Sequence, residues 1–165
     1  MAARTIIESP EDIAAGVRSL RRRCPIMRHC HARAGDPPLR RREPGFEGLA
    51  RIIVGQQLSV ASAEAIWRRT VAAVTPFSAV GFLALGDEAL RAAGLSQPKI
   101  RTLRAAALAV AERRLDFARL TLAGEEEFRA ELTQVSGIGP WTADIFRMFC
   151  LGHRDAFAPG DLALQ

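Results

Sequence analysis

Hydrophobic residues recur three or four positions apart along most of the chain, and no long segment alternates between hydrophobic and polar residues. The first spacing is typical of helices with one buried face, and alternation is typical of strands. In residues 10–23, for example, Ile13, Val17 and Leu20 share one helical face, and Ser9 precedes the segment as a candidate N-cap. The pattern predicts an all-α fold built from short helices.

Residues that begin or end helices divide the rest of the chain. Ser59 and Ser96 are candidate N-caps, Pro76 ends one helix, and Gly94 suits the position just after another. The predicted helices span residues 46–55, 60–74, 88–93, 97–114 and about 125–134, and a further helix begins at Pro140. Paired prolines, glycines and an arginine run predict a loop over residues 31–45. The absence of repeats favours one compact multi-helix domain.

Composition narrows the class of protein. The 165 residues are 48% hydrophobic, which suffices for a core in one domain. The formal net charge of +5 comes almost entirely from arginine, with Lys99 as the single lysine, and it permits an anionic partner such as nucleic acid. Three cysteines, an odd number, argue for a reducing compartment. No apolar run reaches the ~18 residues of a membrane span, so we expect a cytoplasmic protein with no membrane partner.

The segment QVSGIGPWTADIF, residues 134–146, carries the strongest local signal. Gly137 and Gly139 leave their amides uncovered by side chains, so the hairpin between them can approach a partner at backbone distance. Pro140 suits the first turn of a helix whose N-terminal N–H groups point outward, an arrangement that favours phosphate. A plain turn between two helices, with glycine serving only the tight bend, explains the same residues.

Two other motifs accompany this segment, one before it and one after it. It follows RIIVGQQLSVASAEAIW, residues 51–67, and precedes APGDLALQ, residues 158–165. In this order the three motifs resemble the helix-hairpin-helix superfamily of base-excision DNA glycosylases, in its 3-methyladenine DNA glycosylase II branch. The Arg-rich PPLRRREPGF is a fourth landmark, and the resemblance extends from Phe46 to the last residue.

The resemblance implies a partner, double-stranded DNA that contains damaged bases. An enzyme of this kind extrudes the damaged base from the duplex and fills the gap left behind. By similarity Gln57 is the wedge, Gln56 lies beside it as part of the base pocket, and Leu58 packs underneath. A polar interruption of a loop between helices is the alternative for these three. The resemblance also implies that backbone amides of the hairpin bind the DNA backbone, commonly with a monovalent cation on the hairpin carbonyls. The hairpin residues are Ser136, Gly137, Ile138 and Gly139.

Asp161 is the catalytic residue that the resemblance implies. Loss of a base leaves positive charge on the sugar, which a nearby carboxylate stabilises, or the carboxylate orients the attacking water. Without the resemblance, Asp161 is a helix N-cap after Ala158, Pro159 and Gly160, and one residue can fill both roles. Asp155 and Asp144 are the competing acids. We expect Asp144 to be a solvated or salt-bridged surface residue.

Trp141 sets the subclass. Superfamily members that also cleave the strand carry a lysine directly after the hairpin, whose amine forms a Schiff base. Tryptophan cannot do so, and Lys99 belongs to another helix, which implies a monofunctional enzyme that removes alkylated purines such as 3-methyladenine. Trp141 itself would line the base pocket or, alternatively, belong to the core. Other aromatic residues are predicted to be core, namely Phe46, Trp67, Phe146 and Phe149.

The remaining expectations concern domain limits and cofactors. We divide the chain into residues 1–45, an N-terminal helix and Arg/Pro-rich loop packed on the same domain, and residues 46–165, the glycosylase domain. Relatives continue beyond the aspartate, so the C-terminal part is expected to be missing, and an inactive DNA-binding module is the rival function. Cysteines and histidines between residues 24 and 31 match no familiar zinc spacing. We expect no cofactor, a monomer, and a bacterial-type protein associated with the nucleoid.

Overall fold

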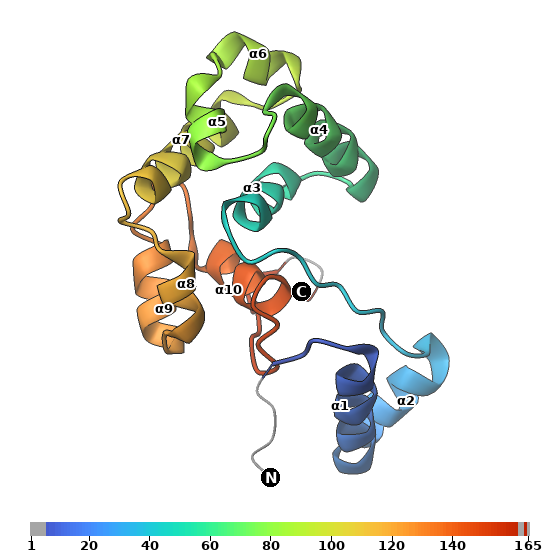
Figure 1. Ribbon diagram of the computed structural model, residues 1–165. Coiled ribbons are helices and arrows are strands. Elements are labelled where there is room, and N and C mark those ends of the chain that lie inside the picture. The colour runs from blue at the N-terminus through green and yellow to red at the C-terminus, as the bar shows by residue number, and fades with distance from the viewer. Residues whose placement is uncertain (1–5, 162–163, 165) are drawn as a thin grey trace.

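Helices make up the architecture that the computed structural model gives for residues 6–161 and 164, the part of the chain that it describes. In Figure 1, α3 to α7 form the upper part, α8 to α10 lie below, and α1 and α2 form a separate hairpin at the lower right. The helices of the described residues are α1 Pro10–Arg23, α2 Pro25–Ala34, α3 Phe46–Gly55, α4 Val60–Ala73, α5 Ala79–Ala84, α6 Asp87–Ala92, α7 Gln97–Ala111, α8 Phe117–Leu122, α9 Glu125–Leu132 and α10 Pro140–Phe149.

Most of the predicted helices are confirmed. The hydroxyls of Ser9 and Ser59 accept hydrogen bonds from the first turns of α1 and α4, as expected of N-caps. The helix predicted to reach residue 114 ends at Ala111. The prediction of a loop from residue 31 is wrong for its first four residues, which belong to α2. This helix has no buried face to produce a periodic signal.

The core gathers around α3, whose apolar residues are nearly all buried. α3 packs against α4, α7 and α10, so it is the element that connects the upper and lower parts of the molecule. The prediction of core aromatics is confirmed for Phe46, Trp67 and Phe146. Phe149 is only half-buried, and the guanidinium of Arg42 lies 5.7 Å from its ring centroid.

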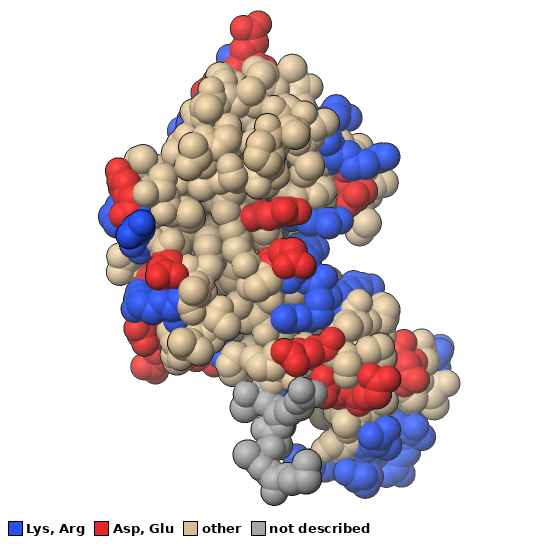
Figure 2. Space-filling view, viewed as in Figure 1, with Lys and Arg blue, Asp and Glu red and all other residues tan. Residues whose placement is uncertain are grey.

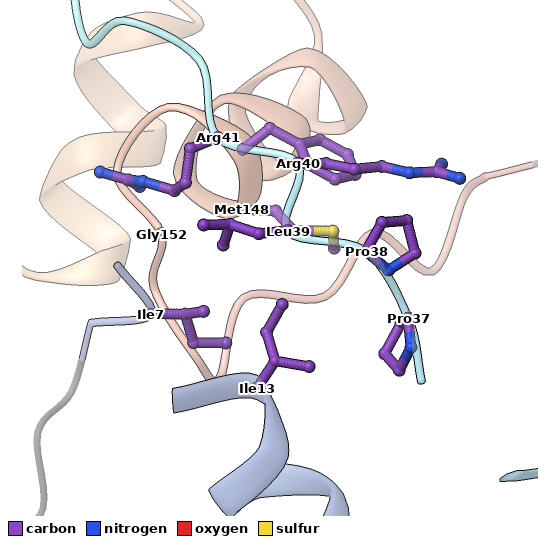
Figure 3. A pocket seen from close by; sticks show the side chains of 10 residues that line it. Ile7, Ile13, Pro37, Pro38, Leu39, Arg40, Arg41, Met148 and Gly152 are labelled. Atoms are coloured by element: carbon purple, nitrogen blue, oxygen red, sulfur yellow. The ribbon is translucent and has the colours of Figure 1, made fainter. Parts of the chain in front are cut away.

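The segments that flank the N-terminal hairpin attach to the end of α10. α1 and α2 pack on each other and bury no residue. The backbone N–H of Ile7 donates to the carbonyl of Gly152 (2.7 Å), and that of Arg42 donates to the carbonyl of Phe149 (2.8 Å). Between these attachments lies a largely apolar hollow of about 400 Å³, which Figure 3 shows with Ile7, Ile13 and Met148 at its walls. No helix in the described part of the chain has the length and apolar character to cross a bilayer.

Cys150 should be protected from thiol reagents in the folded protein. Its side chain is fully buried, and burial raises the pKa of its thiol to about 12. Because the thiolate is the reactive form, we expect iodoacetamide at neutral pH to modify the exposed Cys30 first and the half-buried Cys24 more slowly. Peptide mass spectrometry would locate the label, and a sample in denaturant, where all three react, is the control. Native labelling of Cys150 as fast as Cys30 would contradict the burial.

Candidate functional site

The hairpin between α9 and α10 has one exposed edge and one buried anchor. Ser136 and Gly137 are exposed, whereas the side chain of Ile138 is 5% exposed and belongs to the core. The N–H of Ile138 donates to the carbonyl of Val135 at 3.0 Å and closes the turn. Ile138 therefore fixes the hairpin to the core and leaves the backbone of the two preceding residues at the surface.

The two glycines of the hairpin serve different purposes. Gly137 has φ of +86°, and a Cβ there would collide with the hydroxyl of Thr102 on α7 and lie 3.0 Å from its Cβ. Gly139 has an ordinary φ of −101°, and a Cβ there would meet nothing within 4 Å. Sequence reasoning assigned both glycines to backbone approach. The structure packs the Cα of Gly137 against Thr102, whereas a Cβ on Gly139 would point into open space.

Ion pairs connect α10 to α9. The carboxylate of Asp144 accepts from Arg129 at 2.7 Å, and the guanidinium of Arg147 lies 2.8 Å from the carboxylate of Glu125. The expectation that Asp144 lies at the surface is wrong, since its side chain is 6% exposed, although its ion pair was anticipated. Most faces of α10 are buried, and Asp144 lies on the face that packs against α9. A carboxylate engaged there is a poor candidate for contact with substrate.

Trp141 and Asp161 come together from positions 20 residues apart in sequence. Trp141 lies in the first turn of α10, half-buried against the core, and its indole N–H donates to Oδ2 of Asp161 at 3.1 Å. The N–H of Asp161 donates to the carbonyl of Ala158 at 3.0 Å, in a turn whose alanine is buried. Asp161 is itself half-buried. The competing Asp155 is exposed and pairs with Arg154. The alternative role of Asp161 as a helix N-cap would involve residues 162–163, which lie outside the described part of the chain.

The turn between α3 and α4 contacts the same end of α10. The side-chain amide of Gln56 donates to the hydroxyl of Thr142 at 2.9 Å, and Thr142 is 2% exposed. Gln57, at the tip, is exposed with φ of +56°. Leu58 was expected to pack underneath Gln57, and the structure leaves it 38% exposed.

Two contacts at this turn were missed by sequence reasoning. The ammonium of Lys99 donates to the carbonyls of Val54 (2.6 Å) and Gln56 (2.9 Å). Thr142 is the second missed residue, since nothing in its local sequence marks it as the partner of Gln56. The only available signal for Lys99 was a cation in the first turn of a helix, where the dipole disfavours it.

Most of the candidate site residues therefore come together at the start of α10. Two contacts begin at consecutive residues directly after the exposed hairpin: Trp141 donates to Asp161, and the Thr142 hydroxyl accepts from Gln56. Lys and Arg side chains gather around the notch at the right edge of the molecule in Figure 2 and over the α1–α2 hairpin. Within residues 6–161 and 164, no three His, Cys, Asp or Glu side chains are grouped to hold a metal ion.

Comparison with known proteins finds relatives and similar folds among DNA repair proteins. The DNA-3-methyladenine glycosylase of Saccharomyces cerevisiae is 33% identical over 74% of this chain and 45% of its own length. The crystal structure of a DNA-3-methyladenine glycosidase from Bacillus halodurans superposes with a TM-score of 0.71, at 38% identity, over 78% of this chain and 60% of that one.

The structure of a third relative contains bound DNA. The 3-methyladenine DNA glycosylase of Schizosaccharomyces pombe, in complex with abasic DNA, gives a TM-score of 0.74 at 26% identity, over 83% of this chain and 70% of that one. The chain spans about half the length of the curated yeast relatives. Residues 50–165 match the HhH-GPD superfamily of base excision DNA repair proteins. The chain belongs to this superfamily, as the helix-hairpin-helix resemblance predicted.

Proposed function

We propose that the protein is a monofunctional DNA glycosylase that hydrolyses the N-glycosidic bond of alkylated purines, such as 3-methyladenine, in duplex DNA. The observation that carries the proposal is the contact between Trp141 and Asp161 beside the exposed hairpin, because it joins an aromatic face and a carboxylate at a surface suited to DNA. The names of the yeast and Bacillus relatives support this substrate class.

DNA would be held at the hairpin. The exposed backbone of Ser136 and Gly137, together with the open space beside Gly139, allows a phosphate to approach the amides closely. Surface carbonyls of the same turn are also suitable ligands for the monovalent cation that the resemblance implies. Contacts of this kind position the duplex without reading its sequence.

The extruded base would lie against Trp141. An alkylated purine is electron-poor, so it stacks favourably on the electron-rich indole face. Gln57 would enter the gap in the duplex from its exposed position, while Gln56, fixed to Thr142, would border the bound base. Sequence-independent extrusion then leaves discrimination to the fit of the base in the pocket.

Asp161 would act on the sugar. As the bond between the base and C1′ breaks, positive charge develops on the sugar ring, and the carboxylate stabilises that charge. The electron pair of the C1′–N bond leaves with the cationic alkylated base, which departs neutral. A water molecule then adds at C1′ and gives one proton to the solvent, which leaves the free base and an abasic site. The indole N–H of Trp141 holds the carboxylate in place throughout, at 3.1 Å from Oδ2.

A base-release assay tests the proposal. We expect the protein to release 3-methyladenine from duplex DNA treated with methyl methanesulfonate, measured by chromatography of the free bases, with untreated DNA as the control. Borohydride should trap no covalent adduct, because residue 141 is tryptophan and the ammonium of Lys99 is held by two carbonyls. Duplex binding without release would favour the inactive DNA-binding module, and a trapped adduct would contradict a monofunctional reaction.

A further inference from the structure

The turn that joins α3 to α4 has the geometry of a type II β-turn. Gln56 has φ of −56° and ψ of 132°, Gln57 has φ of +56°, and the N–H of Leu58 donates to the carbonyl of Gly55 at 3.4 Å. In a type II turn the third residue is usually glycine or asparagine, since other residues are strained at positive φ. Glutamine at this position therefore needs something to stabilise the turn.

The distinguishing feature of a type II turn is the orientation of its central peptide. In a type I turn the peptide between the second and third residues is flipped, and the third residue takes negative φ. That peptide here carries the carbonyl of Gln56, which accepts from the ammonium of Lys99 at 2.9 Å. A flip would turn this carbonyl away from Lys99 and break the hydrogen bond. The contact thus favours type II over type I directly.

Lys99 lies where a cation is otherwise unfavourable. It is the third residue of α7, at the positive end of the helix dipole, in a first turn that contains no acidic residue. Its surroundings also disfavour charge, and burial lowers the pKa of its ammonium. The carbonyls of Val54 and Gln56 accept hydrogen bonds from the ammonium and hold it in this position. Because Val54 lies in the last turn of α3 and Gln56 is the second residue of the β-turn, Lys99 connects α7 to the tip.

We propose that Lys99 is a positioning residue that selects the type II turn and thereby presents Gln57 to the DNA duplex. The Thr142 hydroxyl holds the side chain of Gln56 from α10, so α7 and α10 together fix the residue before the wedge. In the alternative turn, Gln57 loses its positive φ and its side chain points elsewhere. The inference rests on the proposed function, since it assigns Gln57 the role of filling the gap.

The test uses Lys99→Met, which keeps an unbranched chain but removes the ammonium. The probe is a duplex with a tetrahydrofuran abasic analogue beside 2-aminopurine, whose fluorescence rises when a wedge unstacks it. We expect Lys99→Met to bind this duplex within about threefold of wild type by anisotropy, because phosphate contacts are elsewhere. The fluorescence rise should be mostly lost, and release of 3-methyladenine should fall about tenfold or more, as expected when a reacting group is misplaced.

The double variant Lys99→Met/Gln57→Asn provides the rescue. Asparagine tolerates positive φ and keeps an amide, so it should restore the type II turn without the lysine and recover part of the fluorescence rise. A role of Lys99 in stability alone would give no such recovery. If Lys99→Met does not melt cooperatively, the same comparison is made with Lys99→Arg, whose planar guanidinium cannot replace a compact ammonium between two carbonyls.

The experiment distinguishes failure of the positioning role of Lys99 from failure of the proposed function. If wild type releases base and Lys99→Met does so equally well with a full fluorescence rise, or if Gln57→Asn rescues nothing, the positioning role is overturned and the proposed function stands. If wild type neither releases base nor unstacks the probe, the proposed function itself fails.

Discussion

Replacing Asp161 by asparagine is expected to slow base release by about 100- to 1,000-fold, the cost typical of losing one group that stabilises transition-state charge. The side chain keeps its shape, and its carbonyl oxygen can still accept from the indole of Trp141, a contact of 3.1 Å in the native protein. The substitution removes the negative charge that the proposed mechanism places opposite the sugar. Affinity for duplex DNA should stay within about threefold, because the proposed phosphate contacts are at the hairpin rather than at Asp161.

Asp155→Asn is the matched control. Asp155 lies six residues earlier in the same C-terminal segment, its side chain is 77% exposed, and its ion pair with Arg154 is at the surface. Removing this charge should leave both release and melting temperature near wild type, because exposed ion pairs contribute little. Undiminished release by Asp161→Asn, measured under single-turnover conditions, would remove Asp161 from the reaction. An equal loss in both variants would indicate a nonspecific effect of charge.

Sequence reasoning was most successful where the signal is local. The helix of residues 10–23 carries its cap, acidic first turn and apolar face within one segment, and the structure matches its limits. The hairpin is similarly local, since Gly139 is the N-cap of α10 and Pro140 is its first residue. α5 and α8 have six residues each, fewer than two turns, and were missed because so short a segment shows no helical period. The equally short α6 was predicted because Gly94 marks its end.

Long-range contacts were beyond sequence reasoning. Gln56 and Thr142 are 86 residues apart, and Lys99 and Gln56 are 43 apart, so no local pattern relates them. Asp144 was misplaced for the same reason, since its burial depends on Arg129 of α9 rather than on its own neighbours. Family resemblance could point to Trp141 and Asp161 individually. Their contact, which makes them one site, required the fold.

Replacing Gly137 by alanine should have the largest effect on stability. The new Cβ would collide with the hydroxyl of Thr102, and φ of +86° is itself strained for alanine. Overpacking and left-handed strain together cost about 2–5 kcal/mol, which corresponds to a fall in melting temperature of roughly 5–15 °C for a chain of this size. Differential scanning calorimetry measures this fall in melting temperature directly. Adding Thr102→Ala, which removes the hydroxyl and the methyl, should recover part of the loss.

Gly139→Ala separates folding from DNA contact within the same hairpin. Its φ of −101° suits alanine, and the added methyl meets nothing within 4 Å, so melting should be nearly unchanged. The methyl would instead occupy the space through which a phosphate approaches the amides, and duplex affinity should fall about tenfold as a charge-assisted hydrogen bond is lost. Unaltered affinity would mean that DNA does not approach the hairpin there. A large loss of stability would mean that Gly139, like Gly137, is required by the fold.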